Sequence, residues 1–198
     1  MKFFSTKKVT TFALFVALCA LANIFDIELS VSEKLSLVLT VCLISGFING
    51  MVGGFLTGFL GDAVGFLIKP SGNAYTPFIG IGMGFAGLIP ALVTFIYKKV
   101  SGKKITEISA LIITAISSVL VFFSVTCGLN TFVIWKTYIS GKKTYKVYLL
   151  SRIATQLPNS ATNAILSCFL NCLLVRIPYF KQFFYVDNVK DDVKEKVE

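Results

Sequence analysis

The sequence predicts an all-α membrane protein whose six helices cross the bilayer and form a bundle with a pocket near the outer face. Of its 198 residues, 55% are hydrophobic and only 15% are charged, and the mean hydropathy is +0.79. A soluble domain carries about 25% charged residues. The charges here cluster between long apolar runs, and a membrane-spanning helix needs roughly 20 apolar residues. Residues 1–182 are therefore expected to form one membrane domain, and 183–198 a charged cytoplasmic tail.

The first three spans are expected at 9–25, 35–49 and 51–68. The first follows three lysines and also has the features of a secretory signal peptide. Because the chain behind it stays hydrophobic, cleavage would release no soluble product, and a retained helix is favoured. A short acidic loop separates the first two spans. Proline, glycine and asparagine at 70–73 predict a turn after the third.

The last three spans are expected at 78–97, 108–135 and 149–175. The fifth is too long for one straight helix across ~30 Å, and Cys127-Gly-Leu-Asn-Thr131 predicts a break. Non-helical backbone at membrane depth survives where it is buried in protein or lines a cavity. Residues 128–135 are therefore expected to re-enter the membrane or wrap a pocket near the outer surface.

The lysines predict the orientation, since cytoplasmic loops of membrane proteins are rich in Lys and Arg. A cytoplasmic N-terminus places the lysines of 98–104 and the C-terminus in the cytoplasm, as an even number of spans requires. The lysines of 136–146 then lie outside. They attract an anionic ligand, or the earlier helices alone set the topology; the sequence leaves both explanations open.

Several function classes are disfavoured. The chain has no histidine, which excludes Ser-His triads and imidazole metal sites. It has no phosphate-binding Gly-Lys-Ser/Thr motif and so no ATP-hydrolysing motif of its own. Its five cysteines lie in apolar context as packing residues. We expect no cofactor, no metal and no nucleic-acid partner.

Small residues predict close helix packing, which in lipid depends on backbone approach. Glycines recur in the second, third and fourth spans at Gly46, Gly50, Gly54, Gly58, Gly80, Gly84 and Gly87. Ala13 and Ala17 form a similar pair in the first span, where internal packing is the simplest explanation from the residues alone.

Polar residues mark the third and sixth spans. Asp62 lies about 12 Å from the outer end of its helix, and a cap, an ion pair or a ligand contact would each explain it. In the sixth span Arg152, Gln156, Asn159 and Asn163 share one face. Helix–helix hydrogen bonds explain the two asparagines, and Arg152 is suited to hold a carboxylate through two hydrogen bonds.

Three motifs together resemble a known family. They are Ala13-x-x-x-Ala17, the segment 58–72 around Asp62, and Gly128-Leu-Asn130-Thr131 followed by Trp135 and Arg152. Over nearly the whole chain, their order is similar to that of the substrate-specific S component of energy-coupling-factor (ECF) vitamin transporters, and to the folate branch in particular.

The resemblance implies a subunit of the prokaryotic cell membrane, not an enzyme, that captures a vitamin outside the cell. It would dock through Ala13 and Ala17 on a transmembrane coupling subunit that carries two cytosolic ATPases. A pterin and its benzoyl ring need aromatic and amide partners, and the glutamate tail of folate needs cations. The expected ligand-binding residues are Asp62, Tyr75, Asn130, Thr131, Trp135, Arg152 and Gln156.

Other functions stay open at this stage. One is an S component for another vitamin, such as pantothenate or a pyridoxine-like molecule. Another is a membrane scaffold of the rod-shape MreD type, which resembles S components in helix number. An intramembrane enzyme is disfavoured because Asp62 lacks a second group for acid–base work. Trp135 has its own alternative role as an interfacial anchor.

Overall fold

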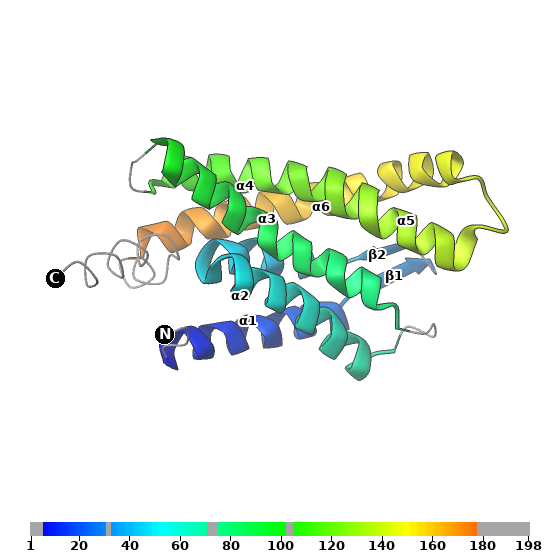
Figure 1. Cartoon of the computed structure of the whole chain (residues 1–198), viewed down its shortest axis with the longest axis horizontal. Helices are drawn as coiled ribbons and strands as arrows, with labels where there is room; N and C mark the ends of the chain where they lie inside the picture. The colour runs from blue at the N-terminus through cyan, green and yellow to red at the C-terminus, as the bar shows by residue number, and fades with distance from the viewer. Residues whose placement is uncertain (1–5, 31–32, 71–74, 102–104, 178–198) are drawn as a thin grey trace.

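The helices run along the longest dimension of the molecule (Figure 1). The computed structural model describes residues 6–30, 33–70, 75–101 and 105–177. Its larger helices are α1 (Thr6–Ile24), α2 (Val38–Ile68), α3 (Pro77–Ser101), α4 (Glu107–Val121) and α6 (Tyr145–Arg176). Between α4 and α6 lie η1 (Phe122–Asn130), α5 (Thr131–Ile134) and η2 (Trp135–Ile139). The predicted tail, 183–198, lies outside the described residues.

A two-stranded antiparallel hairpin stands where the sequence predicted a plain acidic loop. Strand β1 (Ile27–Ser30) pairs with β2 (Glu33–Leu35), and Ile27 lies opposite Leu35. The hairpin lies at the end of the bundle where α1 ends and α6 begins (Figure 1). Hairpin pairing satisfies backbone groups that a loop would leave to solvent.

Helix α2 reverses direction at Gly50 and so contains two spans. Gly50 has φ 76° and ψ −168°, a conformation outside the helical region that costs a non-glycine residue free energy. The two arms lie side by side, because a Cβ on Gly54 would come within 2.8 Å of the Gly46 Cα. The predicted second and third spans are therefore separate helical arms, joined by a turn of one glycine.

Glycines allow both arms of α2 to approach α3 closely, as predicted. A Cβ on either Gly46 or Gly54 would collide with the carbonyl oxygen of Gly87, and a Cβ on Gly58 with that of Met83. No larger side chain fits this seam. Gly50 differs from the other glycines in the pattern, because it forms the turn and not the seam.

The predicted break after Cys127 is wrong: the chain from Glu107 to Ile139 is helical throughout. The excess length is accommodated by the π-helical segments η1 and η2. In a π-helix each N–H bonds to the carbonyl five residues back. The backbone therefore stays hydrogen-bonded through Gly128, and no re-entrant segment is needed.

In the part of the chain that the structure describes, six helical segments run along the bundle: α1, the two arms of α2, α3, the helix of 107–139, and α6. Three described helices are long and apolar enough to cross a membrane by length and composition, namely Val38–Ile68, Pro77–Ser101 and Glu107–Ile139. Helix α1 is a shorter apolar helix. Helix α6 is less apolar because of its polar face.

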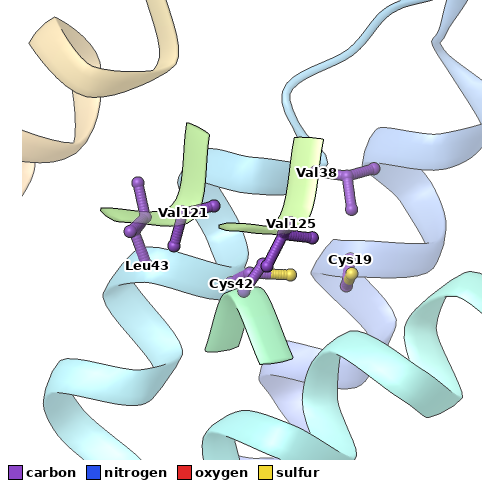
Figure 2. Packing of buried hydrophobic residues seen from close by; sticks show 7 residues of the cluster. Cys19, Val38, Cys42, Leu43, Val121 and Val125 are labelled. Carbon is purple, nitrogen blue, oxygen red and sulfur yellow. The ribbon is translucent and has the colours of Figure 1, made fainter. Parts of the chain in front are cut away.

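A cluster of buried apolar side chains joins α1, α2, α3, α4 and η1 (Figure 2). It contains Cys19 of α1, Cys42 of α2 and Val125 of η1, each at most 2% exposed. Both cysteines are free, in agreement with the packing role expected from the sequence. The cluster also contains Val38, which lines the cavity described below.

At the end of the bundle opposite the hairpin, the start of α4 forms a capping box and an ion pair. Thr106 forms a capping box with Ser109, in which the Thr106 N–H donates to Ser109 Oγ at 2.7 Å. Arg176, the last residue of α6, forms an exposed ion pair with Glu107 at 2.8 Å. The ion pair joins the start of α4 to the end of α6, away from the cavity.

Candidate functional site

A cavity of about 200 Å³ lies at the hairpin end of the bundle. Every helical segment contributes to its walls, as does the chain around β2. Its polar and charged lining residues are Asn23, Asp26, Ser36, Asp62, Lys69, Tyr75, Thr76, Thr126, Asn130, Tyr138, Arg152, Gln156 and Asn159. The apolar ones are Val38, Leu39, Phe66, Ile79, Met83 and Ile134. Carboxylates, cations and amides thus meet within an otherwise apolar bundle.

Asp62 and Tyr75 form one wall, against α3. The Tyr75 hydroxyl and an Asp62 carboxylate oxygen lie 2.5 Å and 3.3 Å from where a Cβ on Gly80 would stand. Burial raises the pKa of Tyr75 to about 12, and the Asp62 carboxylate adds to the shift. Tyr75 is therefore neutral at physiological pH and keeps its hydroxyl proton. The Tyr75 ring also packs on Phe66, with ring centroids 5.1 Å apart.

Arg152 of α6 forms the facing cationic group. It is only 7% exposed, and its Nη1 donates to the Tyr148 hydroxyl at 3.1 Å. One turn further along α6, Gln156 and Asn159 are equally buried, and the Asn159 amide donates to Gln156 Oε1 at 3.5 Å. A buried guanidinium needs a partner of opposite charge or several acceptors.

Three amide side chains of α6, Gln156, Asn159 and Asn163, form a hydrogen-bonded row that we call the amide ladder. The ladder extends past the cavity and bonds to the start of α2. Asn163 Oδ1 accepts from the Thr40 backbone N–H at 3.0 Å and from the Thr40 hydroxyl at 2.8 Å. Asn163 Nδ2 donates to the Ser36 carbonyl at 2.7 Å, and the Ser36 N–H donates to Asn159 Oδ1 at 3.2 Å. Helix–helix hydrogen bonding thus explains Asn163, and it also engages Asn159, which lines the cavity.

The π-helical segments align four residues of the fifth span along the cavity. Thr126, Asn130, Ile134 and Tyr138 all line it, at a spacing of four. In an α-helix each step of four residues overshoots a full turn by about 40°. The wider turns of η1 and η2 offset this drift. Thr131 shows the altered geometry, because its hydroxyl donates to the carbonyl of Thr126, five residues back, at 2.6 Å.

The structure brings five of the seven predicted ligand-binding residues to the cavity: Asp62, Tyr75, Asn130, Arg152 and Gln156. It does not bring Thr131 and Trp135 there. Thr131 is fully buried, with its hydroxyl bonded to its own helix. Trp135 packs on Tyr145 and donates from Nε1 to the Lys143 carbonyl at 2.8 Å. Each directly follows a cavity-lining residue, Asn130 or Ile134, and successive residues of a helix point about 100° apart.

Sequence reasoning missed several lining residues, among them Asn23, Asp26, Lys69, Thr76 and Tyr138. They belong to segment ends and connections, where no periodic pattern singles them out. Tyr138 is positioned by a hydrogen bond between its hydroxyl and that of Thr76, 2.9 Å apart. No signal in the sequence marks Lys69, because it meets Ile24 and Asp26 at the end of α1 only in the tertiary arrangement.

A helical membrane bundle with a polar cavity at one end defines a membrane-embedded solute-binding protein. Comparison with protein families identifies the class: the model of the family "ECF-type riboflavin transporter, S component" matches residues 3–176. The chain belongs to this family, and it is a vitamin-binding transporter subunit, not an enzyme. The resemblance found in the sequence is thereby confirmed, and the alternatives of a scaffold and an intramembrane enzyme are set aside.

The fold is also similar to that of a solved structure, described as the crystal structure of FolT bound with folic acid. The TM-score is 0.63 and the sequence identity 20%, and the match covers 85% of this chain and 94% of that one. A search of curated proteins gave no match.

Proposed function

We propose that the protein captures folate at the outer face of the cell membrane for ATP-driven uptake. The observation that carries the proposal is the buried Arg152 guanidinium in a cavity that also holds the amides of Asn130 and Gln156. Arg152 binds a carboxylate of the glutamate tail. Asp62 and the amides bind the pterin, whose edge presents both N–H donors and acceptors.

Riboflavin is the second candidate, because the family is described by that vitamin. Flavins present an imide and a hydroxylated chain, for which Asn130 and Gln156 are suitable partners. Riboflavin has no carboxylate for the Arg152 guanidinium to bind, whereas folate carries two. The charge pattern therefore favours folate over riboflavin.

The proposed orientation places the cavity outside the cell and both termini in the cytoplasm. Lys98 and Lys99, in the last turn of α3, and Arg176 then lie on the cytoplasmic side, in agreement with the positive-inside rule. The lysines of 136–146, which this orientation places outside the cell, are an exception to the rule. Within the cavity, Lys69 and Arg152 supply the positive charge that attracts an anionic vitamin.

The proposed partner is a transmembrane coupling subunit that carries two cytosolic ATPases. This subunit binds the face of α1 that points away from the rest of the bundle. Ala13 and Ala17 are exposed on that face, next to the exposed Leu14, Leu18 and Leu21. The opposite face of α1, with Cys19, is buried against α2. Small residues flanked by leucines allow a second helix to approach closely within lipid.

Isothermal titration calorimetry on the purified protein in detergent tests the substrate. Folate, riboflavin, pantothenate and pyridoxine are titrated separately into the same preparation. We expect saturable binding of folate that is at least tenfold tighter than that of the other three. Tighter binding of riboflavin, or no heat of binding with folate, would contradict the proposal. Tryptophan fluorescence is a poorer readout, because Trp135 lies off the cavity.

A further inference from the structure

A second cation stands at the rim of the cavity, at the end of α2. Lys69 directly follows α2, is exposed, and lines the cavity. Its Nζ donates to the carbonyl oxygens of Ile24 at 3.0 Å and Asp26 at 3.1 Å. Ile24 is the last residue of α1, and a cation at the last carbonyls of a helix is favourably placed in the helix dipole. The end of α1 therefore holds the ammonium group in position.

These two contacts leave part of the binding capacity of Lys69 unused. An ammonium group has three N–H donors, and carbonyl oxygens do not neutralise its charge. Within the described ranges, Nζ forms no ion pair with a carboxylate, although Asp26 and Asp62 line the same cavity. A fixed cation with a donor left over is suited to bind an anionic group, because its side chain is already ordered.

The two cations of the cavity come from different elements and differ in burial. Arg152 lies on α6 and is buried, whereas Lys69 ends α2 and is exposed. Folate carries two carboxylates on its glutamate, one α and one γ. We infer that Lys69 binds one of these carboxylates at the rim while Arg152 binds the other inside, which makes Lys69 a residue that determines specificity for a dicarboxylate ligand. This inference rests on the proposed folate-binding function.

A purely structural role for Lys69 makes a different prediction. If Lys69 only capped α1, its replacement would weaken every ligand to the same extent, through a loosened α1. If it binds a carboxylate, its replacement weakens only ligands that carry that carboxylate. Folate derivatives in which a single carboxylate is an amide separate the two roles.

The experiment measures dissociation constants by calorimetry for the wild type, Lys69→Met and Lys142→Met. Methionine keeps the apolar stem of lysine and removes the charge. Lys142 is an exposed lysine at the same end of the molecule but outside the cavity lining, so its variant controls for the loss of one positive charge. The ligands are folate, its γ-amide (pteroylglutamine) and its α-amide (pteroylisoglutamine).

We expect Lys69→Met to weaken folate binding about tenfold or more, as for the loss of a charge-assisted hydrogen bond. For one of the two amides, Lys69→Met should weaken binding by less than about twofold. Lys142→Met should change the affinity for folate by less than about twofold, since the charge of Lys142 is screened by solvent and salt. Binding of that amide also shows that the variant is folded. An equal loss for folate and both amides, or no loss for folate, overturns the inference alone. A wild type that does not bind folate overturns the proposed function as well.

Discussion

The hydroxyl of Ser45 donates to the hydroxyl of Thr57 at 2.8 Å. In a straight α-helix residues twelve apart lie about 18 Å from each other. The hydrogen bond is therefore direct evidence that α2 folds back on itself. Thr57 is fully buried and donates in turn to the Gly53 carbonyl at 2.8 Å, so these two hydroxyls at the turn are hydrogen-bonded within α2.

The turn predicts a specific effect of Gly50→Ala. The backbone at this position, with φ 76° and ψ −168°, lies in a region that is open essentially only to glycine and costs an alanine about 1–3 kcal/mol, so the melting temperature in detergent should fall by several degrees. Gly141→Ala is the control, because a Cβ there meets no atom within 4 Å and φ is not positive. An unchanged melting temperature for Gly50→Ala would show that the turn tolerates a side chain.

The proposed carboxylate contact predicts that Arg152→Met weakens folate binding tenfold or more. Loss of a charge-assisted hydrogen bond costs about 1.5–3 kcal/mol, and calorimetry measures it directly. Arg176→Met is the control, since Arg176 lies at the opposite end and pairs with Glu107 in an exposed bridge. If Arg152→Met binds folate like the wild type, the glutamate tail lies elsewhere.

The amide ladder predicts that Asn163→Ala is among the most destabilising single changes. It would leave the Thr40 N–H and the Ser36 carbonyl without their partners, at about 1–3 kcal/mol for each buried group. Thermal unfolding in detergent measures the loss. Thr162→Ala, the neighbouring exposed position that only bonds the Pro158 carbonyl, should be close to neutral. Equal melting temperatures for the two variants would contradict a structural role for the ladder.

The proposed docking face predicts that Ala17→Trp separates vitamin binding from assembly. A bulky side chain on an exposed face leaves the cavity intact but prevents close approach of a second helix. Folate affinity should stay within twofold of the wild type, while co-purification with the coupling subunit and its ATPases should be lost. Ala161→Trp places the same side chain on the exposed face of α6 and should retain the partners. Loss of assembly in both variants would point to a general packing defect.

Much of the architecture could be read from the residues. Long apolar runs, glycines at a spacing of four and the stripe from Arg152 to Asn163 predicted the helical segments, the tight α2–α3 seam and the polar face of α6. Each of these features is a property of a single segment with a regular period, and such a property depends only on local backbone geometry.

The site depended on the tertiary structure. Residues at segment ends, such as Lys69 and Asp26, enter the cavity because α1 and α2 end side by side, and no local pattern records that proximity. In the fifth span, the α-helical period gave no reason to group Thr126, Asn130, Ile134 and Tyr138. The length of the apolar stretch and the run from Cys127 to Thr131 predicted a break where η1 continues the helix. The choice between π- and α-helical turns is decided by packing against neighbouring helices, since both satisfy the backbone hydrogen bonds. The sequence alone therefore determined which segments enter the membrane and which polar groups they carry, while the packing of those segments decided which of these groups meet in one cavity.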